Sequence, residues 1–129
     1  MATSTPGGAK TNLGLEPNIA GLLCYVPCCI GLVFSVVAAI VEKQSRFVRF
    51  HAFQSLLLHG IFIVLWIAIM VVQVGLGFVG LGIVSLLIQL VMWVCGLALL
   101  ALVIFMMIKA NANEEFELPV IGPMARGWV

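Results

Sequence analysis

The sequence predicts an all-α, polytopic membrane protein with three transmembrane helices. Of the 129 residues, 64% are hydrophobic and only 9% are charged, which is too little charge to cover a water-soluble surface. Two long stretches, residues 17–41 and 50–108, contain no Asp, Glu, Lys or Arg. A helix of about 20 apolar residues is enough to cross the hydrocarbon core of a bilayer. We therefore expect lipid to surround most of this chain.

The two uncharged stretches divide into three predicted spans. The first uncharged stretch predicts one span over residues 17–41, with a bend at Pro27 because proline lacks a backbone N–H. The second would be roughly 90 Å long as a single helix, so it must turn back inside the membrane. Residues 73–82 (QVGLGFVGLG) supply four glycines for this turn and predict spans over 53–73 and 83–108. A fourth span would fit only if the first linker or this turn held a short extra segment.

Composition and charge also predict how the chain is divided and oriented. Residues 1–16 are rich in Gly, Ser and Thr and predict a flexible tail, followed by a transmembrane helical bundle over 17–110 and a C-terminal tail over 111–129. Basic residues favour the cytoplasmic side of a membrane. Five basic residues follow the first and third predicted spans: Lys43, Arg46, Arg49, Lys109 and Arg126. The N-terminal tail has only one, Lys10. We expect a bacterial inner membrane, with the N-terminus outside and the first linker and C-terminus in the cytoplasm.

A charged and aromatic segment, residues 45–60 (SRFVRFHAFQSLLLHG), holds the main candidate site. At 100° per residue, His51, Ser55 and His59 fall on one helix face and form a polar stripe that enters the membrane. One interpretation is that the arginines anchor the helix in headgroups and that His51 makes ordinary hydrogen bonds. The other is that the arginines, His51 and Gln54 bind a phosphate, a lipid headgroup or a peptide.

His59 is the deepest ionisable residue of the predicted spans. Ionisable side chains inside a membrane are costly and mark functional sites, although a neutral histidine can simply hydrogen-bond across helices. An imidazole can also be the axial ligand of a tetrapyrrole metal. We expect no bound cofactor, and a tetrapyrrole at His59 stays open as the alternative.

Small and polar residues in the spans predict helix packing. Gly31, Ser35 and Ala39 recur at a spacing of four, which lets two helices approach closely. In the third span, we expect Gln89 to face inward, toward the stripe that contains Ser55. No acidic residue occurs inside any predicted span, so a nucleophile would lack an activating carboxylate there, and we expect no enzyme.

Two motifs suggest a family. The segment FVRFHAFQS at residues 47–55 and the ending EEFELPVIGPMA at residues 114–125 resemble a family of small bacterial membrane proteins of unknown function. That family is related to the Tic-twenty component of the chloroplast protein import machinery. The resemblance implies a polytopic membrane protein with a link to translocation, and it implies these signature residues: Phe47, Arg49, Phe50, His51 and Gln54.

The leading functional hypothesis is a non-enzymatic integral membrane subunit that packs into a larger assembly, with transport as one role for it. One alternative is an accessory subunit of an electron-transfer or photosynthetic complex with a His-ligated tetrapyrrole. Another is an oligomeric pore for ions or peptides. Expected partners are lipids and other membrane subunits or further copies of the chain, whereas a net charge of +1 argues against nucleic acid.

Overall fold

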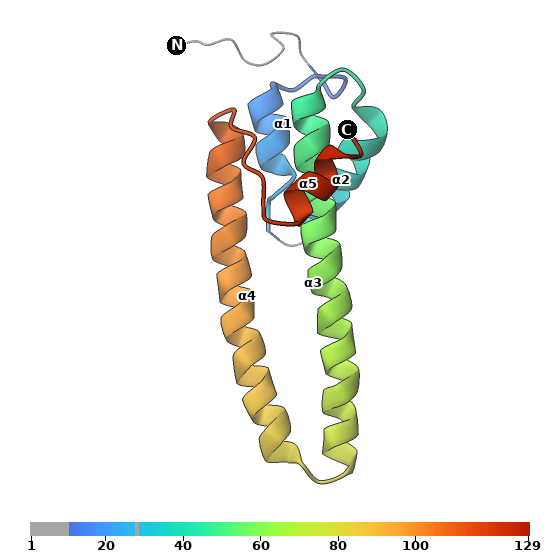
Figure 1. Cartoon of the computed structure of the whole chain (residues 1–129), viewed down its shortest axis with the longest axis vertical. Helices are drawn as coiled ribbons and strands as arrows, with labels where there is room; N and C mark the ends of the chain where they lie inside the picture. The colour runs from blue at the N-terminus through green and yellow to red at the C-terminus, as the bar shows by residue number, and fades with distance from the viewer. Residues whose placement is uncertain (1–10, 28) are drawn as a thin grey trace.

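The computed structural model describes residues 11–27 and 29–129, and these residues form helices and loops without a strand (Figure 1). Two helices are long and apolar enough to cross a membrane, and they run antiparallel as a hairpin: α3 (Arg46–Phe78) and α4 (Gly82–Asn111). Three shorter helices complete the described fold: α1 (Pro17–Leu23), α2 (Cys29–Val41) and α5 (Ile121–Arg126). The predicted all-α, polytopic class is confirmed.

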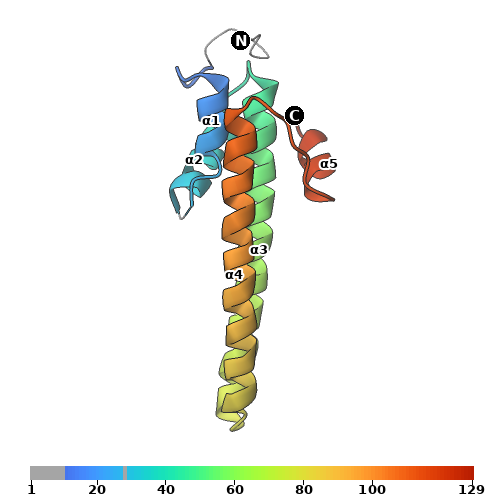
Figure 2. The ribbon, with the colours of Figure 1, turned by 90° about the vertical axis from the view of Figure 1, so that its left-hand side faces the viewer.

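The short helices gather at one end of the hairpin, which we call the head. The head comprises α1, α2, α5 and the adjoining ends of α3 and α4, and it lies opposite the α3–α4 turn (Figure 1). Figure 2 shows α1 and α2 on one side of the hairpin and α5 on the other. Most of the buried residues come from the head, whereas only 11% of the most apolar 18-residue window of each long helix is buried. The rest of the hairpin presents apolar side chains to its surroundings.

The long hairpin follows from local sequence signals. Ser45 caps α3, because its hydroxyl accepts a hydrogen bond from the Val48 N–H at 3.3 Å. With 33 residues, α3 is roughly 50 Å long, which exceeds the hydrocarbon core and reaches through both headgroup regions. The chain reverses at residues 79–81, where Gly80 has a φ of +78° that side chains rarely adopt. The predicted glycine-rich turn is therefore shorter than its ten residues, because α3 continues through Gly75 and Gly77.

The structure differs from the single helix predicted over residues 17–41. Helix α1 has 7 residues and α2 has 13, so α2 is about 20 Å long and too short for the roughly 30 Å hydrocarbon core. Between them the chain reverses at Pro27, which has no N–H to continue a helix. Gly31 permits this reversal, because a Cβ there would lie 2.2 Å from the carbonyl oxygen of Val26. The first apolar stretch thus forms two short helices, α1 and α2, that lie on the same side of the hairpin (Figure 2).

Consequently the start of the described chain and its C-terminal segment both lie in the head, at one end of the hairpin, whereas three full spans would place them at opposite ends (Figure 1). The Asn12 N–H donates to Glu42 at 2.7 Å, and the Asn12 side-chain oxygen accepts from the N–H groups of Lys43 and Gln44 at 3.0 and 3.2 Å. These bonds tie the start of the chain to the linker before α3.

Part of the predicted flexible tail is folded. The Thr11 hydroxyl donates to the Leu15 carbonyl at 2.9 Å, and Leu13 and Leu15 pack against the core. Residues 1–10 of that predicted tail lie outside the described residues. Among the described residues, the packed part of the chain therefore begins at Thr11, six residues before α1.

Candidate functional site

Gln54 links α3 to the C-terminal segment. Its side-chain nitrogen donates to the Tyr25 hydroxyl and to the Phe116 carbonyl, both at 3.0 Å, and its side-chain oxygen accepts from the Leu118 N–H at 3.0 Å. The side chain is fully buried. Since a buried amide is costly without partners, these three bonds explain why an amide is tolerated here.

His51 continues this network and has a defined tautomer. Its Nε2 lies 3.2 Å from the Glu114 carbonyl oxygen, and its Nδ1 lies 3.2 Å from the Tyr25 hydroxyl. A carbonyl only accepts, so Nε2 carries the proton and Nδ1 accepts the Tyr25 O–H. The rings of Tyr25, Phe47 and Phe50 enclose the imidazole in edge-to-face contacts. Neither His51 nor Gln54 has an N–H donor left for an external phosphate or headgroup, and both side chains are fully buried.

The arginines of the head also contact the C-terminal segment. Arg49 donates to the Trp128 carbonyl at 3.4 Å. Arg126 pairs with Glu115 at 2.8 Å and with Glu117, and these hydrogen bonds raise the pKa of the Arg126 guanidinium above its ordinary value. Exposed ion pairs of this kind contribute little stability. Four of the five signature residues are thus buried inside the head, Phe47, Phe50, His51 and Gln54, and the fifth, Arg49, contacts the C-terminal segment.

Two buried polar residues of the head were missed from the sequence. Tyr25 is the only tyrosine of the chain and is fully buried. Glu42 is also fully buried, and its carboxylate accepts from the N–H groups of Asn12, Gln44 and Ser45. The sequence did offer one signal for Glu42, because it is the only acidic residue between Glu16 and Glu114.

The predicted small-residue stripe lies where α2 packs against the rest of the head. Gly31 and Ser35 are buried, and Ala39 is half-buried against the core. The Cys24 carbonyl, at the break after α1, accepts from the Ser55 hydroxyl at 2.5 Å, and the Ser35 hydroxyl lies 2.9 Å from the same oxygen. These serines satisfy a carbonyl that the broken helix leaves free.

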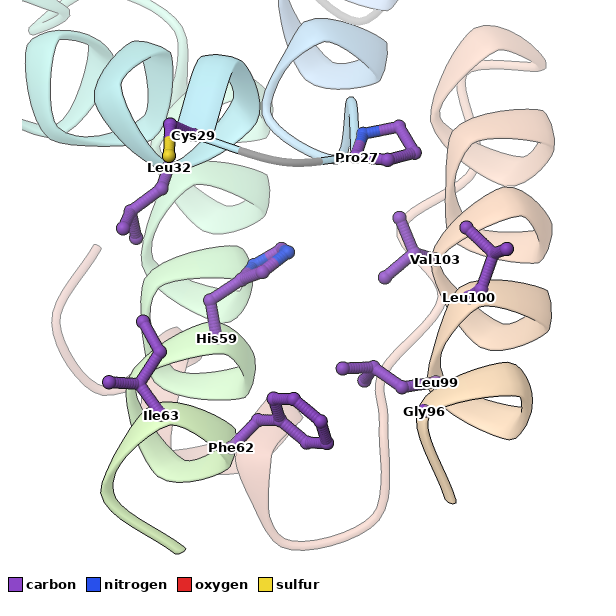
Figure 3. Close-up of a pocket in the computed structure, with 10 residues that line it drawn as sticks. All are labelled: Pro27, Cys29, Leu32, His59, Phe62, Ile63, Gly96, Leu99, Leu100 and Val103. Carbon is purple, nitrogen blue, oxygen red and sulfur yellow. The ribbon is translucent and has the colours of Figure 1, made fainter. Parts of the chain in front are cut away.

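His59 lies one helical turn after Ser55 in α3, on the wall of a cavity between α3, α4 and the α1–α2 connection (Figure 3). The cavity has a volume of about 330 Å³. The His59 Nδ1 lies 2.9 Å from the Ser55 carbonyl oxygen, and the ring projects into the cavity (Figure 3). The remaining walls are apolar except for one thiol: Pro27, Cys29, Leu32, Phe62, Ile63, Gly96, Leu99, Leu100 and Val103.

Gln89 lines a second groove farther along the hairpin, with a volume of about 430 Å³. Both α3 and α4 contribute to this groove, through Trp66 and Trp93 among others. Gln89 thus lies on the groove between the two long helices, but no hydrogen bond joins it to His59. In the described part of the chain, the Gln89 amide has no hydrogen-bond partner at all.

Comparison with known proteins corrects the resemblance drawn from the motifs. The chain is 38% identical to a UPF0132 membrane protein of Methanocaldococcus jannaschii over 120 residues, which cover 92% of this chain and 94% of that protein. It is 33% identical to a UPF0132 membrane protein of Archaeoglobus fulgidus over 111 residues, which cover 86% and 93% of the two chains. No solved structure matches the chain.

These relatives are archaeal membrane proteins, so the assignment to a bacterial family related to the Tic-twenty component is wrong. The FVRFHAFQS segment and the ending both lie inside the match to a different family, which covers residues 14–125. The chain belongs to the magnetosome magnetite crystal formation protein family.

Proposed function

We propose that this chain is a non-enzymatic integral membrane subunit that associates with further copies of itself through the apolar part of its hairpin. The observation that carries this proposal is the unpartnered amide of Gln89 in the first third of α4, which runs from Gly82 to Asn111. An amide in hydrocarbon without a hydrogen bond costs several kcal/mol, roughly 4–8 in a fully apolar solvent. A neighbouring helix is the usual source of a partner at this depth.

The surroundings of Gln89 favour a second copy as that neighbour. On α4, Leu86, Leu90, Trp93 and Leu97 follow a heptad spacing, and their exposed fractions are 60%, 55%, 67% and 64%. An exposed row of apolar residues with this spacing is typical of helix pairs that cross at about 20°. Because an amide both donates and accepts, Gln89 can bond with its own equivalent across a twofold axis.

The polar groups of the head support a structural rather than a catalytic role. Gln54, His51, Ser55 and Glu42 each bond to other parts of the same chain, and none projects into a cavity with a nucleophile. The chemistry of acyl or phosphoryl transfer requires an activated nucleophile with access to substrate. A packing subunit needs only a rigid head and an apolar surface.

The family's name concerns magnetite crystal formation. Within such a process, the features of this chain favour a structural role in the membrane. The α3–α4 turn over residues 79–81 has no carboxylate to hold iron. At the opposite end, Glu114, Glu115 and Glu117 are paired with Lys109 or Arg126. These features favour organisation of a membrane over direct contact with a mineral.

The charge distribution supports an orientation with the head in the cytoplasm. Every basic residue of the described chain lies on the head side of the hairpin, and none lies in residues 50–108. The excess of Lys and Arg on cytoplasmic flanks therefore favours a cytoplasmic head and a turn on the far side of the membrane.

Replacing Gln89 with leucine tests the proposed association. We expect Q89L to raise the dissociation constant of the oligomer by roughly three- to thirtyfold, because interhelical hydrogen bonds in membranes contribute about 0.6–2 kcal/mol. Energy transfer between donor- and acceptor-labelled chains in detergent, at varied protein-to-detergent ratios, measures this constant.

The matched control is Q73L, which makes the same substitution near the turn end of α3, outside the groove that Gln89 lines. It should leave the dissociation constant unchanged. A wild-type chain that stays monomeric at every ratio, or a Q89L oligomer as tight as the wild type, would contradict the proposal.

A further inference from the structure

The hydrogen bonds of His59 fix which ring nitrogen is free. Its Nδ1 lies 2.9 Å from the Ser55 carbonyl oxygen and 3.1 Å from the Ser55 hydroxyl. A carbonyl only accepts, and the single hydroxyl proton of Ser55 is used toward the Cys24 carbonyl at 2.5 Å. Nδ1 therefore carries the ring proton and donates to Ser55. The other nitrogen, Nε2, is left with an unprotonated lone pair.

This lone pair faces an apolar chamber. Figure 3 shows the ring tip of His59 directed into the space bounded by Pro27, Phe62, Leu99 and Val103. Among the described residues, no group donates a hydrogen bond to Nε2. Of the described side chains on the wall, Cys29 has the one other polar group, a thiol, and a thiol is a weak donor. The site therefore offers one directed acceptor in surroundings that otherwise attract only apolar groups.

The size and character of the chamber match a small molecule from the bilayer. Its volume of about 330 Å³ lies at the lower end of the range for small-molecule sites, roughly 300–1,000 Å³. A ligand must bring a hydrogen-bond donor for Nε2 and an apolar body for the walls. Phenols combine a hydroxyl that donates strongly with a flat ring that can pack against Phe62. We propose that the His59 cavity binds a lipophilic phenol, whose hydroxyl donates to His59 Nε2 while its ring and tail lie among the apolar side chains.

A matched pair of probes tests this assignment on the full chain in detergent micelles. The probe 4-nonylphenol carries the hydroxyl, and its methyl ether, 4-nonylanisole, has the same body without the donor. We expect the phenol to bind about tenfold more tightly than the ether, equivalent to about 1.4 kcal/mol. We also expect the phenol alone to shift the ¹⁵N resonance of His59 Nε2 toward that of a hydrogen-bonded nitrogen.

Two variants distinguish the contribution of the His59 Nε2 acceptor from that of the cavity volume. H59F keeps an aromatic ring but removes the acceptor, so it should bind phenol and ether equally. G96L should lose both ligands, because a side chain at Gly96 enters the cavity wall without meeting any other atom within 4 Å. Q89L should bind the phenol as the wild type does, which separates this site from the proposed association.

Four results would overturn the proposal. These are equal affinity for the two probes, a phenol preference that survives in H59F, an Nε2 resonance unmoved at saturating phenol, and no saturable binding. A tetrapyrrole absorption band in the purified wild-type chain that H59F lacks would likewise overturn it, because the same lone pair would then bind a metal.

Discussion

Replacing Gly31 with alanine is expected to lower the free energy of unfolding by about 3 kcal/mol, the upper part of the range for overpacked sites. The new Cβ would lie 2.2 Å from the carbonyl oxygen of Val26 and 2.8 Å from its backbone nitrogen. Both are backbone atoms, so no side-chain rotation can relieve the overlap. The connection between α1 and α2 must shift, and the packing of α2 on α3 is lost with it.

Denaturation in mixed micelles, with SDS as the denaturant, measures this change in stability. Gly75 provides the matched control, since it lies inside α3 and a Cβ there meets no atom within 4 Å. G75A should therefore be neutral or stabilise the protein by up to about 1 kcal/mol, through the better helix propensity of alanine. If G31A were as stable as G75A, the tight reversal at Pro27 would be disproved.

Replacing Gln54 with leucine is expected to cost about 3 kcal/mol, because it leaves the Phe116 carbonyl and the Leu118 N–H buried without partners, at about 1–3 kcal/mol each. The Tyr25 hydroxyl also loses a donor. Since these partners belong to the C-terminal segment, Q54L should release that segment from α3. Trypsin cleavage after Arg126, followed by mass spectrometry, measures the release together with the loss of stability.

The control for Q54L is again Q73L, which removes a half-buried amide with no partner in the described chain. Q73L should cleave at the wild-type rate and keep its stability. Equal cleavage rates for Q54L and the wild-type chain would show that the C-terminal segment is held by other contacts.

The hairpin could be predicted from the sequence because its signals are local. An uncharged run too long for one crossing and a cluster of glycines were enough to place a turn within residues 73–82. The break at Pro27 was also visible, but its consequence was not. Hydropathy does not reveal whether a chain continues or returns after a break, and that outcome depends on the contact between Gly31 and Val26.

The site was harder to predict because its partners are distant in sequence. His51 and Gln54 were recognised as polar residues at the membrane surface, but the groups that bury them come from Glu114, Phe116 and Leu118, more than 60 positions away. A sequence pattern cannot show that contact. The spacing of His51, Ser55 and His59 predicts that they share one face of α3. Which nitrogen of His59 is free can be decided only from the positions of Ser55 and Cys24 in the structure.

We propose that the chain crosses the membrane twice, so that the start of α1, the linker before α3 and the C-terminal segment share one side. One cysteine is added at an exposed position in each variant, E16C, K43C, V79C or M124C, and is labelled with a membrane-impermeant maleimide in sealed right-side-out and inverted vesicles. The labelling of the wild-type chain, which has four cysteines of its own, is subtracted as background. We expect E16C, K43C and M124C to react in the same vesicles and V79C only in the opposite ones. Labelling of E16C from the side opposite to K43C would mean that the first apolar stretch crosses the bilayer, and would contradict this topology.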